Sequence, residues 1–218
     1  FLASRGAKIE NGAVTDFGDP AGELAACNDQ TVVADLSHFG LIGFSGEEAQ
    51  TFLHGQITND LRNLRENLAV FAGYLSPKGR MLANFLVMKR GGDVLVMLPE
   101  SLREGIQKRL SMFILRSKVK ARNADSEWVR LGINGVDAVS IVADILGVTV
   151  AEGMMAVSQG EQAFALRLGD GRFDLFITPD AAPLAWEKLA SRATLVGAPA
   201  WDWLMGRAGV PVELPQTQ

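Results

Sequence analysis

The sequence predicts an α+β fold, with antiparallel or mixed sheets and helices packed on them. Short strand-like runs dominate the first half of the chain, helix-like runs follow strands, and the same order of elements recurs later. At 48% hydrophobic and 21% charged residues, the 218-residue chain has enough apolar side chains for a sizeable core. This apolar content argues against intrinsic disorder.

Residues 31–55 are expected to form two strands followed by a helix. Residues 31–44 are rich in β-branched and aromatic side chains but are interrupted within 37–40, which predicts two strands with a break between them. Ser45 then has the character of a helix cap, and acidic residues follow it. Apolar residues recur three or four apart beyond this point, so a helix is expected over about 46–55.

Two further strands and a second helix are expected between residues 69 and 113. The strands 69–75 and 80–89 are separated by a turn at 76–79 that contains Pro and Gly, as in a hairpin. A short buried strand is predicted at 94–98. Pro99 then opens a helix whose apolar positions are three or four residues apart. These positions are Leu102, Ile106, Leu110 and Phe113.

A second copy of this pattern is expected in the second half of the chain. Residues 132–138 resemble residues 43–49, a strand leading into a capped helix in both, and a later strand is again followed by a proline and a helix. Two copies of a β-α-β-β-β-α unit are therefore predicted, at about 38–115 and 130–190.

Charge, cysteine content and hydropathy argue against a nucleic-acid-binding, disulfide-bonded, secreted or membrane-spanning protein. The formal net charge of −4 gives no global basic field for nucleic acid, although a local basic patch stays open. The single cysteine excludes an intrachain disulfide, no apolar run approaches a membrane span, and the N-terminal residues lack the apolar core of a signal peptide. We therefore expect a cytoplasmic protein without a membrane partner or direct nucleic-acid binding. Because the chain runs from Phe1 to Gln218, both ends are expected to be cut from a longer sequence.

The sequence carries no nucleotide-binding, zinc-protease or paired-cysteine motif. Its two histidines, His38 and His54, lie on different predicted elements, which does not suit a structural metal site. Cys27 has no basic neighbour that would lower the pKa of its thiol, so a half-buried structural cysteine is expected. No metal site and no catalytic residue are therefore predicted.

Three exposed cations are candidates for binding an anionic ligand. Lys78 and Arg80 flank a glycine at the predicted hairpin turn, where they suit either an acidic ligand tail or an ordinary solvated turn. Arg116 lies at a predicted helix C-terminus, where the helix dipole alone would explain a cation. The residues themselves leave both interpretations open.

The segment Trp201-Asp202-Trp203 has the highest local density of aromatic residues in the chain. The two rings fall on opposite sides of a strand, or about 200° apart on a helix, so they are not expected to face one core. One ring would then line a cleft, where a flat heteroaromatic ligand would stack on it. Asp202 would accept hydrogen bonds from the paired N–H donors of an amino-pyrimidine.

Several blocks in the chain resemble the YgfZ family of folate-binding, tRNA-modifying proteins. The blocks are SGEEAQTFLHGQITNDL, AGYLSPKGRMLANF, FILRSKVKA and WDWLMGRAGVPV. This family is related to the T-protein, the aminomethyltransferase of the glycine cleavage system. The matching blocks run from about Asp35 to Val212, and FLxGQxTxD followed by a KG[KR] turn is their most specific part.

The resemblance implies a T-protein-like folate-binding fold with tetrahydrofolate, or a one-carbon derivative, in a central channel. It places Phe39 and Trp201 on either side of the pterin, with the cations meeting the glutamate tail. The residues that would line the same cavity are Asn59, Asp60, Lys78, Arg80 and Arg116.

The resemblance also implies a domain organisation. One discontinuous α+β subdomain is expected over 1–47 plus 123–218, with an inserted ferredoxin-like subdomain over 48–122. The family's C-terminal barrel domain is expected to be absent from the chain. Its Lys-Gly-Cys-Tyr-x-Gly-Gln-Glu segment would lie beyond Gln218.

The implied function is tetrahydrofolate binding that supports iron–sulfur cluster assembly or repair and, through it, tRNA modification. Iron–sulfur assembly proteins or client enzymes would be the protein partners. In the transferase branch, the strand after the Gly turn carries paired aspartates, whereas Asn84 stands in this stretch and can neither hold a charge nor move a proton. Asn84 is therefore expected to line the folate cavity, and active aminomethyl transfer is not expected.

Two alternatives stay open. A folate-dependent aminomethyltransferase or demethylase would need an acid near the pterin nitrogen, and Asp60, Asp170 or Asp202 would supply it. An interaction scaffold with an empty channel would bind no folate at all.

Overall fold

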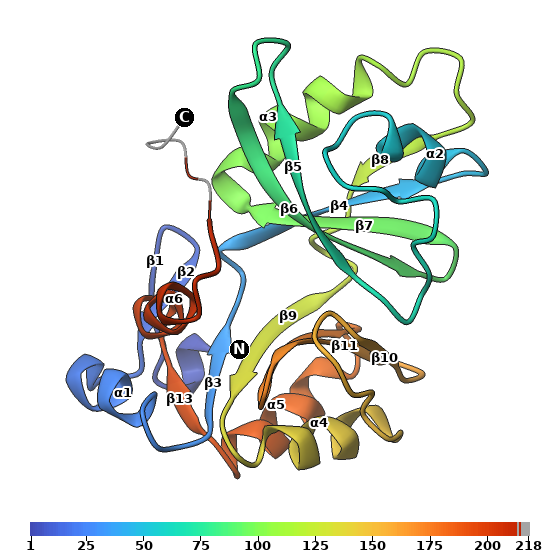
Figure 1. The fold of residues 1–218 in the computed structure, drawn as a ribbon. Helices are drawn as coiled ribbons and strands as arrows, with labels where there is room; N and C mark the ends of the chain where they lie inside the picture. Colours follow the sequence, from blue (N-terminus) through green and yellow to red (C-terminus); the bar gives the residue numbers. More distant parts are fainter. Residues whose placement is uncertain (213, 215–218) are drawn as a thin grey trace. The chain divides into compact units, whose positions relative to one another are not determined.

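The computed structural model describes residues 1–212 and 214, which form two compact units (Figure 1). Unit 1 combines Phe1–His38 with Glu127–Val210. Unit 2 combines Phe39–Ser126 with the described residues from Pro211 onward. Residues 213 and 215–218, at the end of the expected first subdomain, lie outside the described residues.

Unit 2 is inserted into unit 1, and its boundaries fall before β4 (Phe39–Ser45) and after β8 (Lys120–Asn123). The sequence placed these boundaries at 47/48 and 122/123. The two strands belong with the insert because they pair with each other, and β4 also pairs along its length with a third strand of unit 2. Hydrogen-bonded strands of one sheet share one core and are not divided between units.

Unit 2 is built on an antiparallel five-stranded sheet of order β5-β6-β7-β4-β8. Besides β4 and β8, it contains β5 (Val70–Leu75), β6 (Met81–Arg90) and β7 (Asp93–Pro99). Helices α2 (Ala49–His54) and α3 (Glu100–Ser111) contribute apolar side chains to the same core as the strands. The strands and helices predicted for this region are present, with ends that differ by a few residues.

One predicted core position in unit 2 is wrong. Leu102, Ile106 and Leu110 are buried on α3 as expected, but Phe113 lies beyond the end of the helix and is 47% exposed. The chain leaves the helix after Ser111, so the spacing of three residues no longer keeps Phe113 on the buried face.

Unit 1 contains a six-stranded sheet of order β10-β11-β12-β9-β3-β13, antiparallel except for the parallel pair β3–β13. Its strands are β3 (Val32–Asp35), β9 (Val129–Asn134), β10 (Val157–Gln159), β11 (Ala163–Gly169), β12 (Arg172–Ile177) and β13 (Thr194–Val196). Its helices are α1 (Pro20–Ala26), α4 (Ala138–Leu146), α5 (Ala182–Ala190) and α6 (Ala198–Arg207). The N-terminal part adds the 3-10 turn η1 (Ala3–Arg5) and the hairpin of β1 (Lys8–Glu10) and β2 (Ala13–Asp16). The predicted α+β fold is confirmed.

The two faces of the six-stranded sheet differ in character. Helices α4 and α5 lie along one face, where their apolar side chains form a core with Val33, Leu131 and Phe173 (Figure 1). Because successive side chains of a strand point to opposite faces, Gly132 and Asp174 belong to the other face. That second face is the setting of the candidate site.

The internal repeat predicted from the sequence is present. The order β4-α2-β5-β6-β7-α3 in unit 2 matches β9-α4-β10-β11-β12-α5 in unit 1, and in each copy the first strand pairs with the fourth. Gly46 and Gly135, with φ of 113° and 140°, occupy matching positions between the first strand and the first helix. Glycine suits both turns because side chains disfavour positive φ.

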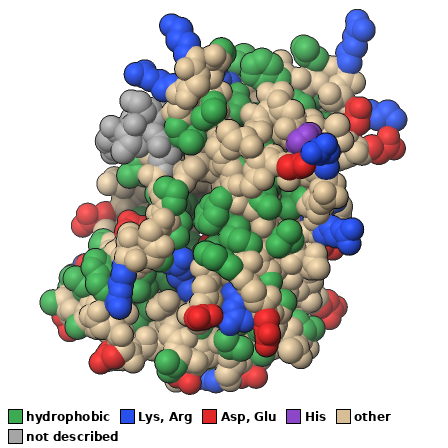
Figure 2. All heavy atoms as spheres, in the orientation of Figure 1, with side chains coloured by type: hydrophobic (Ala, Val, Ile, Leu, Met, Phe, Trp, Pro, Cys, Tyr) green, Lys and Arg blue, Asp and Glu red, His purple; other side chains and the backbone are tan. Residues whose placement is uncertain are grey.

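The face of the protein drawn in Figure 2 carries both basic and acidic side chains, so it does not form a single basic field. Within residues 1–212 and 214, no helix combines the length and apolar character needed to cross a membrane.

Candidate functional site: a buried charged face of the six-stranded sheet

Three charged side chains are buried on the second face of the unit 1 sheet. Arg130 lies on β9, and Arg172 and Asp174 lie on β12, each less than 8% exposed. In the strand register Asp174 stands opposite Gly132. Charged groups are seldom buried in a core, because burial removes their hydration. Their gathering on one sheet face therefore marks a candidate functional site.

Asp174 is the centre of this site. Burial raises the pKa of its carboxyl group to about 7, although the positive charges of Arg172 and His38 act in the opposite direction. Its Oδ1 atom is buried and has no hydrogen-bond partner among the described residues. This oxygen can therefore accept a hydrogen bond from a donor outside the described residues.

Arg172 is fixed by the backbone around it. Its Nη1 atom donates to the carbonyl oxygen of Leu204 at 3.5 Å, and its Nη2 atom donates to that of Leu168 at 3.3 Å. The first bond joins β12 to α6, the second joins it to β11, and together they hold the guanidinium group in place. Arg172 therefore supplies a fixed positive charge to the surroundings of Asp174.

Trp201 closes the site from α6. A Cβ atom placed on Gly132 would lie 2.4 Å from the indole ring, so the ring rests directly on the glycine backbone. The indole is fully buried, and its Nε1 atom has no hydrogen-bond partner within the described part of the chain. Trp203 on the same helix is 37% exposed, which confirms that the two rings do not face one core.

His38 links this face to the surface. It lies in the break between the first two strands, as expected, and its Nε2 atom is 3.6 Å from Oδ1 of Asp202 on α6. Asp202 itself is largely exposed, so the pair joins a surface carboxylate to the charged groups below. That Asp202 accepts hydrogen bonds from a ligand stays a prediction.

The other predicted site residues belong to unit 2. Asn59 donates from Nδ2 to the carbonyl oxygen of Phe71 at 2.7 Å, and its Oδ1 atom accepts from the backbone of Asp60. Asp60 forms an ion pair of 2.6 Å with Arg62, which lowers the pKa of the Asp60 carboxyl group. Both residues thus have local structural roles in the loop before β5.

Lys78, Arg80 and Arg116 are exposed, the first two at the β5–β6 turn and the third beyond the end of α3. Asn84 stands on β6 opposite Gly73. Phe39, the first residue of β4, is 6% exposed. Whether these residues contact folate stays a prediction.

Sequence reasoning missed Arg130, Arg172 and Asp174. The sequence predicted a strand over 173–177, and none of its side chains was assigned a functional role. A signal was present, because charged Arg172 and Asp174 alternate with apolar Phe173 and Leu175, which indicates a strand with one polar face.

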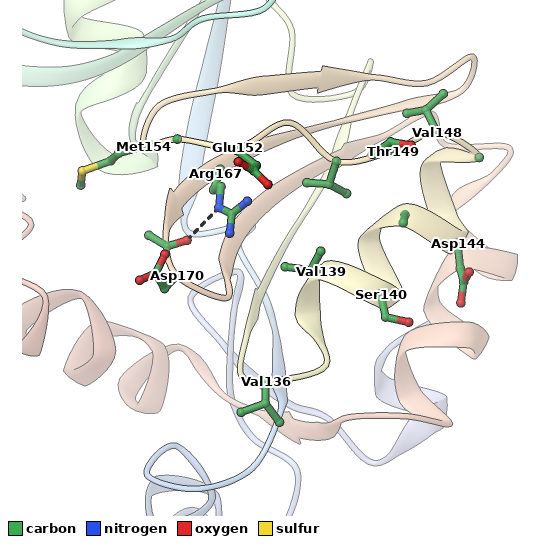
Figure 3. Close-up of a pocket in the computed structure, with 15 residues that line it drawn as sticks. Val136, Val139, Ser140, Asp144, Val148, Thr149, Glu152, Met154, Arg167 and Asp170 are labelled. Carbon is green, nitrogen blue, oxygen red and sulfur yellow. Dashed lines mark hydrogen bonds between the residues drawn. The ribbon is translucent and has the colours of Figure 1, made fainter.

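A groove elsewhere in unit 1 lacks buried charged groups like those around Asp174. It is an open groove of about 1300 Å³ bounded by α4, the loop after it and the end of β11 (Figure 3). Arg167 reaches into it, but its guanidinium group already donates to the carbonyl oxygens of Gly169 and Ala151. None of the predicted folate-binding residues lines it. The labelled residues of its wall are Val136, Val139, Ser140, Asp144, Val148, Thr149, Glu152, Met154 and Asp170.

Among residues 1–212 and 214, no three His, Cys, Asp or Glu side chains are grouped so that they could hold a metal ion. The two histidines lie in different units.

Cys27 is more deeply buried than expected, at 4% exposure. Burial, and secondarily the charge of Glu23, raise the pKa of its thiol. We expect the native protein to react with a disulfide reagent at pH 8 at least about tenfold more slowly than the unfolded chain, because the thiolate is disfavoured and shielded. Absorbance of the released thiolate measures both rates, and equal rates would contradict the assignment of an inert cysteine.

Comparisons with known proteins show which family and fold the chain resembles. The family model described as the GCVT N-terminal domain matches residues 16–200. The protein called tRNA-modifying protein YgfZ in Shigella boydii serotype 4 (strain Sb227) is 26% identical over 92% of this chain and 61% of its own length. Its namesake in Klebsiella pneumoniae (strain 342) is 29% identical over 81% of this chain and 54% of its own. The chain thus spans less than two thirds of these relatives.

A solved structure shows the same fold. The glycine cleavage system aminomethyltransferase T from Bartonella henselae superposes with a TM-score of 0.83, at 20% identity, over 97% of this chain and 62% of that one. The resemblance to YgfZ and to the T-protein is confirmed. Since the family model covers most of its length, the chain belongs to the family of GCVT N-terminal domains.

Proposed function

We propose that unit 1 binds the pterin ring of a tetrahydrofolate on the face that carries Asp174. The observation that supports this is the buried carboxyl group whose Oδ1 atom lacks a partner among the described residues. The amino-pyrimidine edge of a pterin presents paired N–H donors, which match the two oxygens of a carboxylate. Such a ligand would satisfy an acceptor that is otherwise costly to bury.

The surroundings of Asp174 suit this ligand. Trp201 supplies an aromatic wall on Gly132, and Arg172 supplies a fixed positive charge that favours the ionised carboxyl group. The family resemblance adds further contacts to this proposal. Phe39 and Asn84 would contact the folate, and the cations at 78, 80 and 116 would bind its glutamate tail.

We further propose that folate binding serves iron–sulfur cluster assembly or repair and, through a client enzyme, tRNA modification. The relatives that carry the name tRNA-modifying protein YgfZ support the link to tRNA modification, and the iron–sulfur step belongs to the proposal through the family resemblance. The negative net charge and the mixed charge of the surface in Figure 2 favour an indirect role rather than direct tRNA binding.

Replacing Asp174 by Asn tests the binding proposal. Isothermal titration of 5-methyltetrahydrofolate into the full-length protein should show an affinity at least about tenfold lower for Asp174→Asn, because the paired charge-assisted bonds are lost. Asp180→Asn, a change at an exposed position just beyond β12, is the matched control and should bind like the parent. Unchanged affinity of Asp174→Asn would exclude this face as the pterin site.

The pKa of Asp174 predicts a proton release on binding. With a pKa of about 7, the free carboxyl group is about half protonated at pH 7, and the proposed acceptor is the carboxylate. Binding should therefore release about half a proton at pH 7, and the affinity should rise with pH up to about 7 and then level off. Titrations in two buffers of different ionisation enthalpy measure the proton count. An affinity independent of pH between 5.5 and 8 would contradict this prediction.

A folate-dependent transferase is the second candidate, and Asp174 is also the observation that favours it. General acid–base catalysis is most effective when the pKa lies near the working pH, as it does here. Steady product formation from methylene-tetrahydrofolate, abolished in Asp174→Asn, would establish this alternative over a protein that only binds folate.

A further inference from the structure

A separate cavity of about 400 Å³ lies within unit 1, on the side of the six-stranded sheet that α4 and α5 cover. We call it the Asp35 cavity. Asp35 and Ser37 form its polar end, and its apolar wall includes Leu2, Val14, Leu131, Pro183 and Trp186. The volume lies within the range of about 300–1,000 Å³ that small-molecule sites occupy.

The polar end of the Asp35 cavity is a buried acid whose hydrogen bonds come from one neighbouring residue. Asp35 is 4% exposed and accepts hydrogen bonds from the backbone N–H and the Oγ–H of Ser37, at 3.2 and 2.8 Å. Burial raises the pKa of the Asp35 carboxyl group, and the hydrogen bonds from Ser37 and the charges of His38 and Arg130 act in the opposite direction. Each carboxylate oxygen keeps the capacity for a further donor.

The apolar end is rigid and aromatic. Trp186 on α5 is buried and stacks against Phe17, with ring centroids 6.1 Å apart and an interplanar angle of 27°. The N-terminal turn η1 is tied to α5 by an ion pair between Arg5 and Glu187, and the guanidinium group of Arg5 lies over the ring of Phe1. Phe1 and Leu2 are thereby held at the cavity.

Exposed apolar side chains also line the cavity. Ile9 is 50% exposed and Leu2 is half-buried. A ligand with a hydrocarbon group would cover them. Its cationic end would donate to the carboxylate oxygens of Asp35 and add a positive charge that favours the ionised form.

We propose that the Asp35 cavity binds a small primary amine that carries one aromatic or branched aliphatic group. The ammonium group donates to Asp35, and the hydrocarbon group packs against Trp186, Leu131 and Val14. The site is distinct from the proposed folate site, because Asp35 and Leu131 lie on the helix-covered face whereas Asp174 lies on the other.

Phenethylamine is the probe, and 3-phenylpropionate is the comparator of similar shape and opposite charge. Titration of each into the full-length 15N-labelled protein should give saturable amide shifts at Ser37 and Leu131 for the amine only. Asp35→Asn should weaken amine binding about tenfold or more, because a charge-assisted bond becomes a neutral one. Asp170→Asn, at an exposed carboxylate elsewhere in unit 1, should leave the affinity unchanged.

A second variant guards against a folding effect of Asp35→Asn. Ala182→Leu narrows the cavity from α5 and keeps the acid, so it should also abolish the shifts. Saturating 5-methyltetrahydrofolate should leave amine binding unchanged, which keeps this test separate from that of the proposed function. The proposal is overturned if the propionate binds as well as the amine, if the shifts map outside the cavity, or if the full-length protein shows no saturable shift.

Discussion

Asp174→Asn should make the protein more stable at pH 8 by about 4 kcal/mol, the value expected for a carboxyl pKa raised from 3.8 to about 7. The buried carboxyl group is harder to ionise in the folded protein than in the unfolded chain. As the pH rises from about 4 to about 7, the unfolded chain loses this proton first, so the parent protein loses stability over that window. The amide of the variant carries no such penalty.

Urea unfolding at several pH values measures this effect. The variant and the parent should differ little at pH 4, diverge up to pH 7, and stay apart above it. Asp180→Asn should follow the parent at every pH, because its carboxylate is exposed. A parent protein whose stability relative to Asp174→Asn did not change with pH would contradict the assignment. The expected gain in stability, together with lost folate affinity, would show that the acid is kept for binding.

Trp201→Ala should lower the free energy of unfolding by about 3–5 kcal/mol, the usual cost of removing a fully buried large aromatic side chain. The indole is fully buried on Gly132, so its loss leaves a cavity between α6 and the sheet. Trp203→Ala on the same helix should cost less than about 1 kcal/mol, because this ring is partly exposed. Urea unfolding of the two variants gives the comparison, and equal losses would show that Trp201 does not anchor α6.

Gly132 provides an independent check of the same contact. Gly132→Ala would place a methyl group within 2.4 Å of the indole and should destabilise the parent protein. The same change in a Trp201→Leu background should cost less, because the smaller side chain leaves room. A double-mutant cycle with no coupling would show that the two residues do not share this contact.

Local patterns in the sequence predicted most of the fold. Alternating β-branched residues, a Pro- and Gly-containing turn and helical spacing are features of neighbouring residues, so they revealed β5, β6 and α3 without knowledge of the tertiary structure. The repeat was readable because its two copies carry matching glycine turns, at 46 and 135. Phe113 was misplaced because periodicity does not show where a helix ends.

The alternation around Asp174 is visible in the sequence, but the assembly of the candidate site depends on tertiary structure. Asp174 and Gly132 are far apart along the chain, and only the pairing of β12 with β9 brings them opposite each other. The partner of that glycine, Trp201, was singled out for its aromatic character, but its place on the sheet follows from how α6 packs. The acid Asp35 was hidden for the same reason, since its surroundings come from segments of unit 1 that are far apart in the sequence.

In the sequence, the main segment of unit 2 lies between β3 and β9, and this order indicates how such a chain could evolve. Asp35 stands opposite Leu131 in the antiparallel pair, and the N–H of Leu36 donates to the carbonyl oxygen of Arg130 at 3.0 Å. These two strands are arranged as the arms of a hairpin whose connecting loop has been replaced by a whole folded module. The entry and exit strands of that module also pair with each other, so a gene fragment encoding it could be gained or excised while a short turn restored the host sheet.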